Sequence, residues 1–216
     1  MKWIKPVALV ALGLVVFGVV MTTRAQDDAA AESAATTYDF KDPKGVNGIG
    51  FFVNSKLEPF IGTGSGITGE VTYDPDNPES FTGSISVDAT TLSVTNPTMT
   101  EHMRGAGWLG VEENPKITMT FDEVTEVKEG SVGDKLLTVT GTLQALGLSL
   151  DKNVEISVSL IPDGADQRGG GKTGDLLVLR SNFVVTRKDL GLKPDMSAEK
   201  VGNEIGIVVG IVGYEK

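Results

Sequence analysis

The chain has 216 residues, no cysteine and one histidine, and its 19 basic and 29 acidic side chains give a net charge of −10. The lack of cysteine excludes disulfides, thiolate metal sites and a cysteine nucleophile, and the single histidine excludes any site that needs two imidazole ligands. The acidic balance excludes nucleic acid as an expected partner and disfavours anionic lipid surfaces.

The N-terminal segment has the pattern of a signal peptide for secretion. Lys2 and Lys5 precede an apolar run from residue 7 to 21, and Thr23-Arg24-Ala25 resembles a cleavage site. We therefore expect residues 1–25 to be removed and the protein to be periplasmic or secreted. An uncleaved anchor is the alternative, although the run is short for a span of roughly 20 apolar residues. Cleavage would leave 16 basic against 29 acidic side chains, a net charge of −13.

Residues 26–37 (QDDAAAESAATT) are small, polar and rich in alanine, which predicts a flexible leader. From Tyr38 to Lys216 the composition stays uniform, with glycine spread along the chain rather than gathered in a linker. We therefore predict a single domain over residues 38–216.

Within this domain the dominant hydrophobic period is two, which is typical of half-buried antiparallel strands. The alternation is clearest at 67–73, 81–87, 117–121 and 154–160, and further strands are expected at 46–53, 136–143, 176–185 and 204–214. The last of these is nearly all isoleucine, valine and glycine, so it is expected either to be buried on both faces or to close a barrel.

One segment, Pro97–Leu109, has a helical pattern. Thr98 or Thr100 could cap its start, and Gly105 and Gly107 would end it.

About eight strands with little helix must protect their edges, either by closing into a barrel or by forming two stacked sheets. The 27 glycines, many of them inside strands, favour the tightly coiled alternative. The predicted fold is all-β: an antiparallel, eight-stranded β-barrel with one short helix.

Three glycine-rich or acidic motifs resemble binding sites but lack the structural context that such sites need. Residues 64–69 (GSGITG) precede a strand and not a helix, and no helical pattern follows residues 169–173 (GGGKT). The segment 162–174 is interpreted as a mobile hairpin loop. Residues 74–77 (DPDN) lack the glycine and glutamate of a calcium loop and are interpreted as a turn.

Several stretches, in the same order along the chain, resemble the YceI family. They are TEHMRGAGWLGV (100–111), NPKITMTF (114–121), YDF (38–40), GEVTYD (69–74) and GTLQALG (141–147). The family's R-x-D-F-G-L region is similar to SNF (181–183) together with DLGL (189–192), in a stretched form. Residues 45–54 lack the two histidines that the family carries in its early strand, so no role of those histidines is assumed here.

The resemblance implies a lipocalin-like barrel, a periplasmic or secreted location, and an amphiphilic ligand: a long isoprenoid lipid or a quinone. No other cofactor is expected. The segment from Pro97 to Gly110 is the candidate lid or mouth, where His102 and Arg104 could meet a phosphate or quinone head group. The candidate lining residues are Phe51, Phe60, Met103, Trp108, Met119, Phe121 and Leu146.

The sequence leaves two other functions open. One is a stress-related or interaction protein whose barrel has a solid core and holds no lipid. The other is an enzyme acting on a bound lipid, which is disfavoured because His102 has no recognisable nucleophile or orienting carboxylate. A transient contact with a membrane for lipid exchange and a homodimer are also open.

Overall fold

The computed structural model describes residues 35–131 and 133–216. The predicted signal peptide and most of the predicted leader lie outside the described residues. Thr36 and Thr37, which were assigned to the leader, belong to the first strand, β1 (Thr36–Asp39), so the folded domain begins before the predicted Tyr38.

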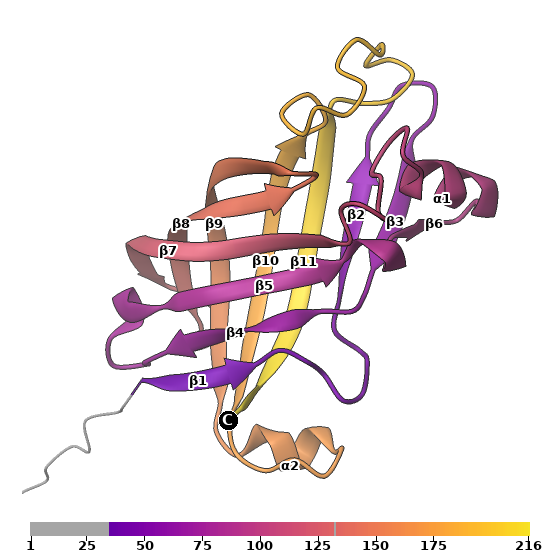
Figure 1. Ribbon diagram of the computed structural model, residues 1–216. Helices are drawn as coiled ribbons and strands as arrows, with labels where there is room; N and C mark the ends of the chain where they lie inside the picture. Colours follow the sequence, from indigo (N-terminus) through magenta and orange to yellow (C-terminus); the bar gives the residue numbers. More distant parts are fainter. Residues whose placement is uncertain (1–34, 132) are drawn as a thin grey trace, which may run out of the picture. The chain divides into compact units, whose positions relative to one another are not determined.

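In the described part of the chain, eight antiparallel strands close into a barrel, as predicted, because β1 pairs with both β4 and the last strand, β11. Figure 1 shows β4, β5 and β7 crossing in front of β10 and β11. The other seven strands of the ring are β4 (Thr68–Tyr73), β5 (Thr82–Asp88), β7 (Lys116–Glu129), β8 (Lys135–Ala145), β9 (Leu148–Ile161), β10 (Leu176–Thr186) and β11 (Glu204–Glu215).

Three further strands extend the sheet from β11: β2 (Gly48–Val53), β3 (Phe60–Gly64) and β6 (Ser93–Val94). The sequence predicted β2 but neither β3 nor β6, because both are too short to show a period. The N-terminal half of β11 pairs with β2 and its C-terminal end pairs with β1. The expectation that β11 closes a barrel is confirmed, whereas burial on both faces is wrong, since Val208 is 45% exposed.

Asn47 joins the two partners of β11. Its side chain is 5% exposed and bonds to Val212, which lies between the positions of β11 that pair with β2 and with β1. Asn47 Oδ1 accepts from Val212 N at 3.0 Å, and Nδ2 donates to Val212 O at 2.8 Å and to Phe40 O at 3.0 Å. The amide therefore replaces a missing backbone partner in the ladder.

The loop before Asn47 is folded around Asp42. Its carboxylate accepts from the backbone N–H groups of Lys44, Val46 and Asn47, and from Arg168 Nη2 at 2.8 Å. Burial raises the pKa of Asp42, but these hydrogen bonds and the guanidinium charge outweigh it and hold the pKa below its usual value.

Strand β7 runs well beyond the predicted 117–121. Its pairing with β8 shifts register between Phe121 and Glu123 and again between Val124 and Glu126. Each bulge moves the following side chains to the other face, so the period of two is lost although the strand continues.

The predicted helix is α1 (Pro97–Arg104), which is shorter than the predicted Pro97–Leu109 because Gly105, the first of the two expected terminators, already ends it. Its cap is Asn96, whose side chain accepts from Met99 N at 3.1 Å, and not Thr98 or Thr100. A second helix, α2 (Gly164–Arg168), occupies part of the segment that was interpreted as a loop, so the prediction of one short helix is too low. Two 3₁₀ turns, Pro78–Ser80 and Ala89–Thr91, complete the helical structure of the described residues. Within those residues, no helix has the length and apolarity to cross a bilayer.

The barrel is filled at the end where β11 terminates. Tyr38, Phe40, Val71 and Leu177 are at most 2% exposed there. Tyr73, Phe81 and Phe121 add a run of ring contacts with centroid distances of 6.3 and 5.2 Å. This close-packed end supports the strands that surround a hollow at the other end.

We predict that Asn47→Ala lowers the free energy of unfolding by at least about 2 kcal/mol, because it leaves one buried and two partly buried backbone groups without this partner. Urea unfolding followed by circular dichroism measures the change. Asn153→Ala, at an exposed position of β9, is the matched control and should lie within about 0.5 kcal/mol of the wild type. Equal stability of the two variants would contradict a role for Asn47 in the ladder.

Candidate functional site

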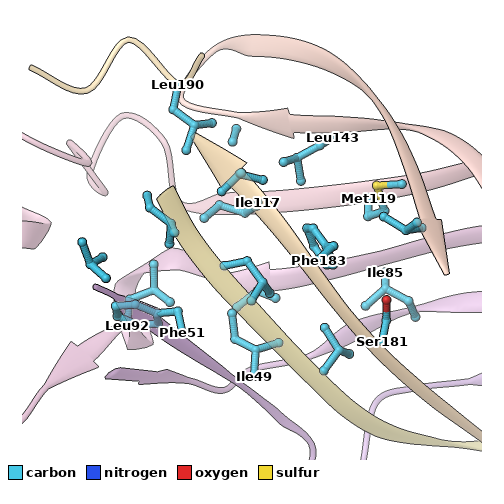
Figure 2. Close-up of a pocket in the computed structure, with 18 of the residues that line it drawn as sticks. Ile49, Phe51, Ile85, Leu92, Ile117, Met119, Leu143, Ser181, Phe183 and Leu190 are labelled. Carbon is cyan, nitrogen blue, oxygen red and sulfur yellow. The ribbon is translucent and has the colours of Figure 1, made fainter. Parts of the chain in front are cut away.

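Side chains that point inward from the strands surround an apolar cavity of about 210 Å³ (Figure 2). A single water molecule needs roughly 10–15 Å³ on the same kind of measure, so the cavity has room for a chain of many heavy atoms. Its walls are almost entirely hydrocarbon and include Ile49, Phe51, Phe60, Ile85, Leu92, Ile117, Met119, Phe121, Leu143, Ala145, Val154, Phe183, Val185, Ile205, Ile207, Val209 and Ile211.

The cavity is elongated along β11. Ile205, Ile207, Val209 and Ile211 alternate inward and all reach it. At about 3.4 Å per residue these positions span about 20 Å. A space of this shape suits an extended hydrocarbon chain better than a compact ring system.

Two connections close the end of the cavity away from the packed core. Met103 and Trp108 reach it from the segment that includes α1, and Leu190, Leu192 and Val201 reach it from the segment between β10 and β11. The predicted lid, Pro97 to Gly110, therefore contributes to the cavity wall.

Helix α1 is fixed to the neighbouring strand. Thr100 Oγ1 accepts from Val94 N at 3.0 Å and donates to Val94 O at 3.1 Å. Arg104 Nε donates to Leu92 O at 2.7 Å. These bonds hold the helix beside the cavity.

Six of the nine residues that were predicted as ligand contacts lie on the cavity wall, namely Phe51, Phe60, Met103, Trp108, Met119 and Phe121. The other three lie elsewhere. His102 is exposed on α1, and Leu146 takes a left-handed φ of 54° in the β8–β9 turn, where it packs on the core. Arg104 is half-buried and uses Nε to hold Leu92, a residue of the wall. Across residues 35–131 and 133–216, no group of three or more metal-ligating side chains comes together.

Polar side chains on the wall are few and belong to Trp108, Arg180, Ser181 and Arg187. The Ser181 hydroxyl, visible in Figure 2, donates to Glu155 O at 2.6 Å. It keeps acceptor capacity towards a ligand.

Arg187 is a residue that the sequence interpretation missed. It stands at the end of β10, borders the cavity and is 1% exposed. Its guanidinium donates to five backbone carbonyls of the connection that follows: Leu192 at 2.7 Å, Met196 at 2.9 Å, Val201 and Gly202 at 3.4 Å, and Lys193. Carbonyl dipoles thereby solvate the buried charge, and the connection is held over the end of the cavity.

A signal for Arg187 was present in the sequence. The R-x-D-F-G-L pattern fits residues 187–192 (RKDLGL) directly, with Leu190 in place of the phenylalanine, so no stretching back to Ser181 is needed. Gly191 has a φ of 66°, which explains the glycine of the pattern.

Comparisons with known proteins agree on one family. A family model of the YceI-like domain matches residues 29–212. Protein YceI of Escherichia coli O157:H7 is 26% identical over 188 residues, which is 85% of this chain and 90% of that protein. Protein YceI of Salmonella arizonae is 24% identical over 170 residues, 76% of this chain and 82% of that protein.

Solved structures show the same fold. BcnA of Burkholderia cenocepacia superimposes with a TM-score of 0.61 at 14% identity, covering 77% of this chain and 95% of that one. A polyisoprenoid binding domain from Saccharophagus degradans superimposes with a TM-score of 0.57 at 10% identity, covering 85% of this chain and all of that one. The lipocalin-like barrel implied by the resemblance is confirmed.

We predict that Arg187→Ala lowers the free energy of unfolding by at least about 2–3 kcal/mol, because several buried carbonyls lose their donors. Limited proteolysis should then cut between residues 187 and 203. Arg187→Lys should recover part of the stability, since an ammonium offers three donors. The control is Arg180→Ala, an exposed arginine of the same strand whose Nη1 contacts one hydroxyl. Proteolytic cleavage outside residues 187–203, or an equal loss of stability in Arg180→Ala, would refute the role of Arg187 in holding this connection.

Proposed function

The chain belongs to the family of YceI-like domains, and on this basis together with the cavity we propose that it binds a long isoprenoid lipid or quinone and carries it outside the cytoplasm without catalysis. The observation that carries the proposal is the elongated apolar cavity inside the barrel. The likeness to a solved polyisoprenoid binding domain supports the choice of ligand class. The signal-like residues 1–25 support a periplasmic or secreted location.

Burial of hydrocarbon would supply most of the affinity. Covering on the order of 300 Å² of an isoprenoid chain is worth about 7 kcal/mol at roughly 25 cal/mol per Å². This term is proportional to area and does not distinguish one chain chemistry from another. Selectivity in the proposal therefore comes from the length and shape of the cavity.

We propose that the isoprenoid chain of the ligand contacts Phe51, Phe60, Trp108, Met119 and Phe121. Met103, on α1, would contact the same chain near the end of the cavity, and Leu146 would contact it at the rim, next to Ala145.

For the head group we propose the end beside α1. Arg104 Nε holds Leu92 of the cavity wall, and in this proposal the remaining N–H groups of Arg104 donate to a phosphate or quinone oxygen. His102 lies farther out on the exposed side of the helix.

The alternative, a solid barrel with no ligand, is disfavoured by the energy of an empty hollow. At about 24 cal/mol per Å³ of cavity, 210 Å³ costs about 5 kcal/mol. That is a large share of the roughly 5–15 kcal/mol by which domains are stable. A guest that fills the space removes this cost.

We predict that Ala145→Phe, which adds a ring inside the cavity, greatly reduces the lipid that is purified with the protein. Extraction with organic solvent and mass spectrometry measure the amount. Gln144→Phe is the matched control, because the preceding residue of β8 is exposed on the outer face. Equal lipid content in the two variants, or no lipid in the wild type, would reject the proposal.

We predict that an isoprenoid quinone quenches the fluorescence of Trp108 in the delipidated, mature protein. The chain has two tryptophans, and the other, Trp3, lies in the predicted signal peptide. An isoprenoid alcohol without the quinone ring should compete and restore the emission, because both chains need the same cavity. Saturable quenching without competition would show that the quinone binds elsewhere.

A further inference from the structure

The wall of the barrel has an unpaired seam between β9 and β10. These strands pair over Leu176–Ser181 and Ile156–Ile161. Beyond Ser181, the described residues of β10 pair with β11 alone, and the first half of β9, up to Glu155, pairs with β8 alone. Backbone hydrogen bonds do not join the wall along this stretch.

Both sides of the seam reach the cavity. Val154 lines it from β9, and Phe183 and Val185 line it from β10. At the far end, Leu148 lies close to Gly191, where an added Cβ would be 3.9 Å from Leu148 Cδ1. The seam therefore has apolar side chains at the cavity on its β10 side and at both ends, whereas on β9 the inward alternation of Leu150 and Val154 is interrupted by Lys152.

The outer surface next to the seam carries a row of exposed apolar side chains. Register pairs connect Val184 to Gly206, Gly206 to Phe52, and Phe52 to Ile61. Val184, Phe52 and Ile61 are 50%, 45% and 69% exposed. The Phe52 ring covers Gly206, where an added Cβ would come within 2.1 Å of it.

A second row, Asn182, Val208, Gly50 and Thr63, runs beside the first. We call the eight positions of the two rows the neutral face. None of them is charged, although 22% of the chain is. The neutral face covers β10, β11, β2 and β3, whose opposite sides line the cavity.

We propose that the neutral face docks on a zwitterionic lipid bilayer, so that the isoprenoid chain passes sideways through the β9–β10 seam. This rests on the proposed function, because the seam matters only if the cavity holds a lipid. The row begins at Val184, on the strand that borders the seam. Docking there brings the seam to the lipid surface. The isoprenoid chain can then pass between the bilayer and the cavity without crossing water.

Charge and area favour a bilayer as the occupant. The acidic chain repels anionic lipid, and the neutral face offers no charge to a basic or acidic protein partner. Its exposed apolar surface is on the order of 400 Å², taking roughly 150–250 Å² for a large side chain. A stable protein interface needs about 800 Å² from each partner. A second copy of the chain is thus disfavoured on this face.

The docking face is tested by quinone transfer from phosphatidylcholine vesicles to the delipidated mature protein, followed by Trp108 quenching. Phe52→Asn and Ile61→Asn should slow transfer by roughly tenfold or more, because each removes on the order of 100 Å² of apolar contact. Final occupancy should be unchanged. Ile161→Asn, at an exposed apolar position outside the neutral face, should transfer at the wild-type rate.

The seam is tested by a disulfide, since the chain has no cysteine of its own. Glu155→Cys with Asn182→Cys places the bond one step beyond the last register pair, Ser181 with Ile156. Oxidation should slow transfer, and a thiol reductant should restore it. Ser159→Cys with Val178→Cys links the same strands inside the paired region and should change nothing.

Three results would overturn the proposal. They are unchanged transfer in the Phe52 and Ile61 variants, unchanged transfer in the fully oxidised seam variant, and a wild-type dimer in light scattering that these face variants dissociate. Binding to vesicles without quinone tests docking independently of cargo. Absence of lipid from the purified protein would reject the proposed function instead, and the two failures are therefore distinguishable.

Discussion

The pairing of β11 with two different strands is the interaction on which the cavity depends. β2 holds its N-terminal half and β1 holds its C-terminal end, and Asn47 supplies the missing bonds at Val212 between them. If the contact with β2 opened, the inward isoleucines of β11 would be exposed to water along that edge. Asp42 shapes the loop that delivers Asn47, so a small polar cluster at one end maintains an apolar hollow at the other.

The molecule divides its core into a filled part and a hollow part. Tyr38, Phe40 and Leu177 fill the end near the C-terminus, where the strands pair on all sides. Phe121 borders both parts, because its ring contacts Phe81 and also lines the cavity. The solid-core interpretation is thus correct for one end of the barrel. Stability is concentrated there, which lets the other end tolerate a cavity and an incomplete wall.

Much of the fold could be predicted because the alternation of apolar and polar residues along a strand indicates which side chains are buried. The period of two in residues 67–73 and 81–87 located β4 and β5, and aromatic and methionine side chains in such runs, such as Met119, do reach the cavity. The bulges of β7 break the period of two, so the second half of this strand was not predicted. Arg187 was missed because its partners are backbone carbonyls up to fifteen residues away, which leave no composition signal. The exposure of His102 depends on how α1 is rotated by Thr100 and Arg104.

The seam between β9 and β10 could not be predicted from any local pattern, since both strands read as ordinary strands. It arises because the second half of β10, which ends just before Arg187, follows β11, whereas the first half of β9 follows β8. Because each strand stays paired with its other neighbour, β9 and β10 separate and no longer pair with each other. A closed antiparallel ring with one partly open joint results. On the β10 side the inner residues are apolar and the outer ones uncharged, whereas the β9 side carries Lys152 in the inward alternation and exposed Asp151 and Glu155 outside. For the lipid carriage proposed above, such a joint allows both tight enclosure and exchange. Beyond the bond from Ser181 Oγ to Glu155 O, the wall can part there without breaking a backbone–backbone hydrogen bond.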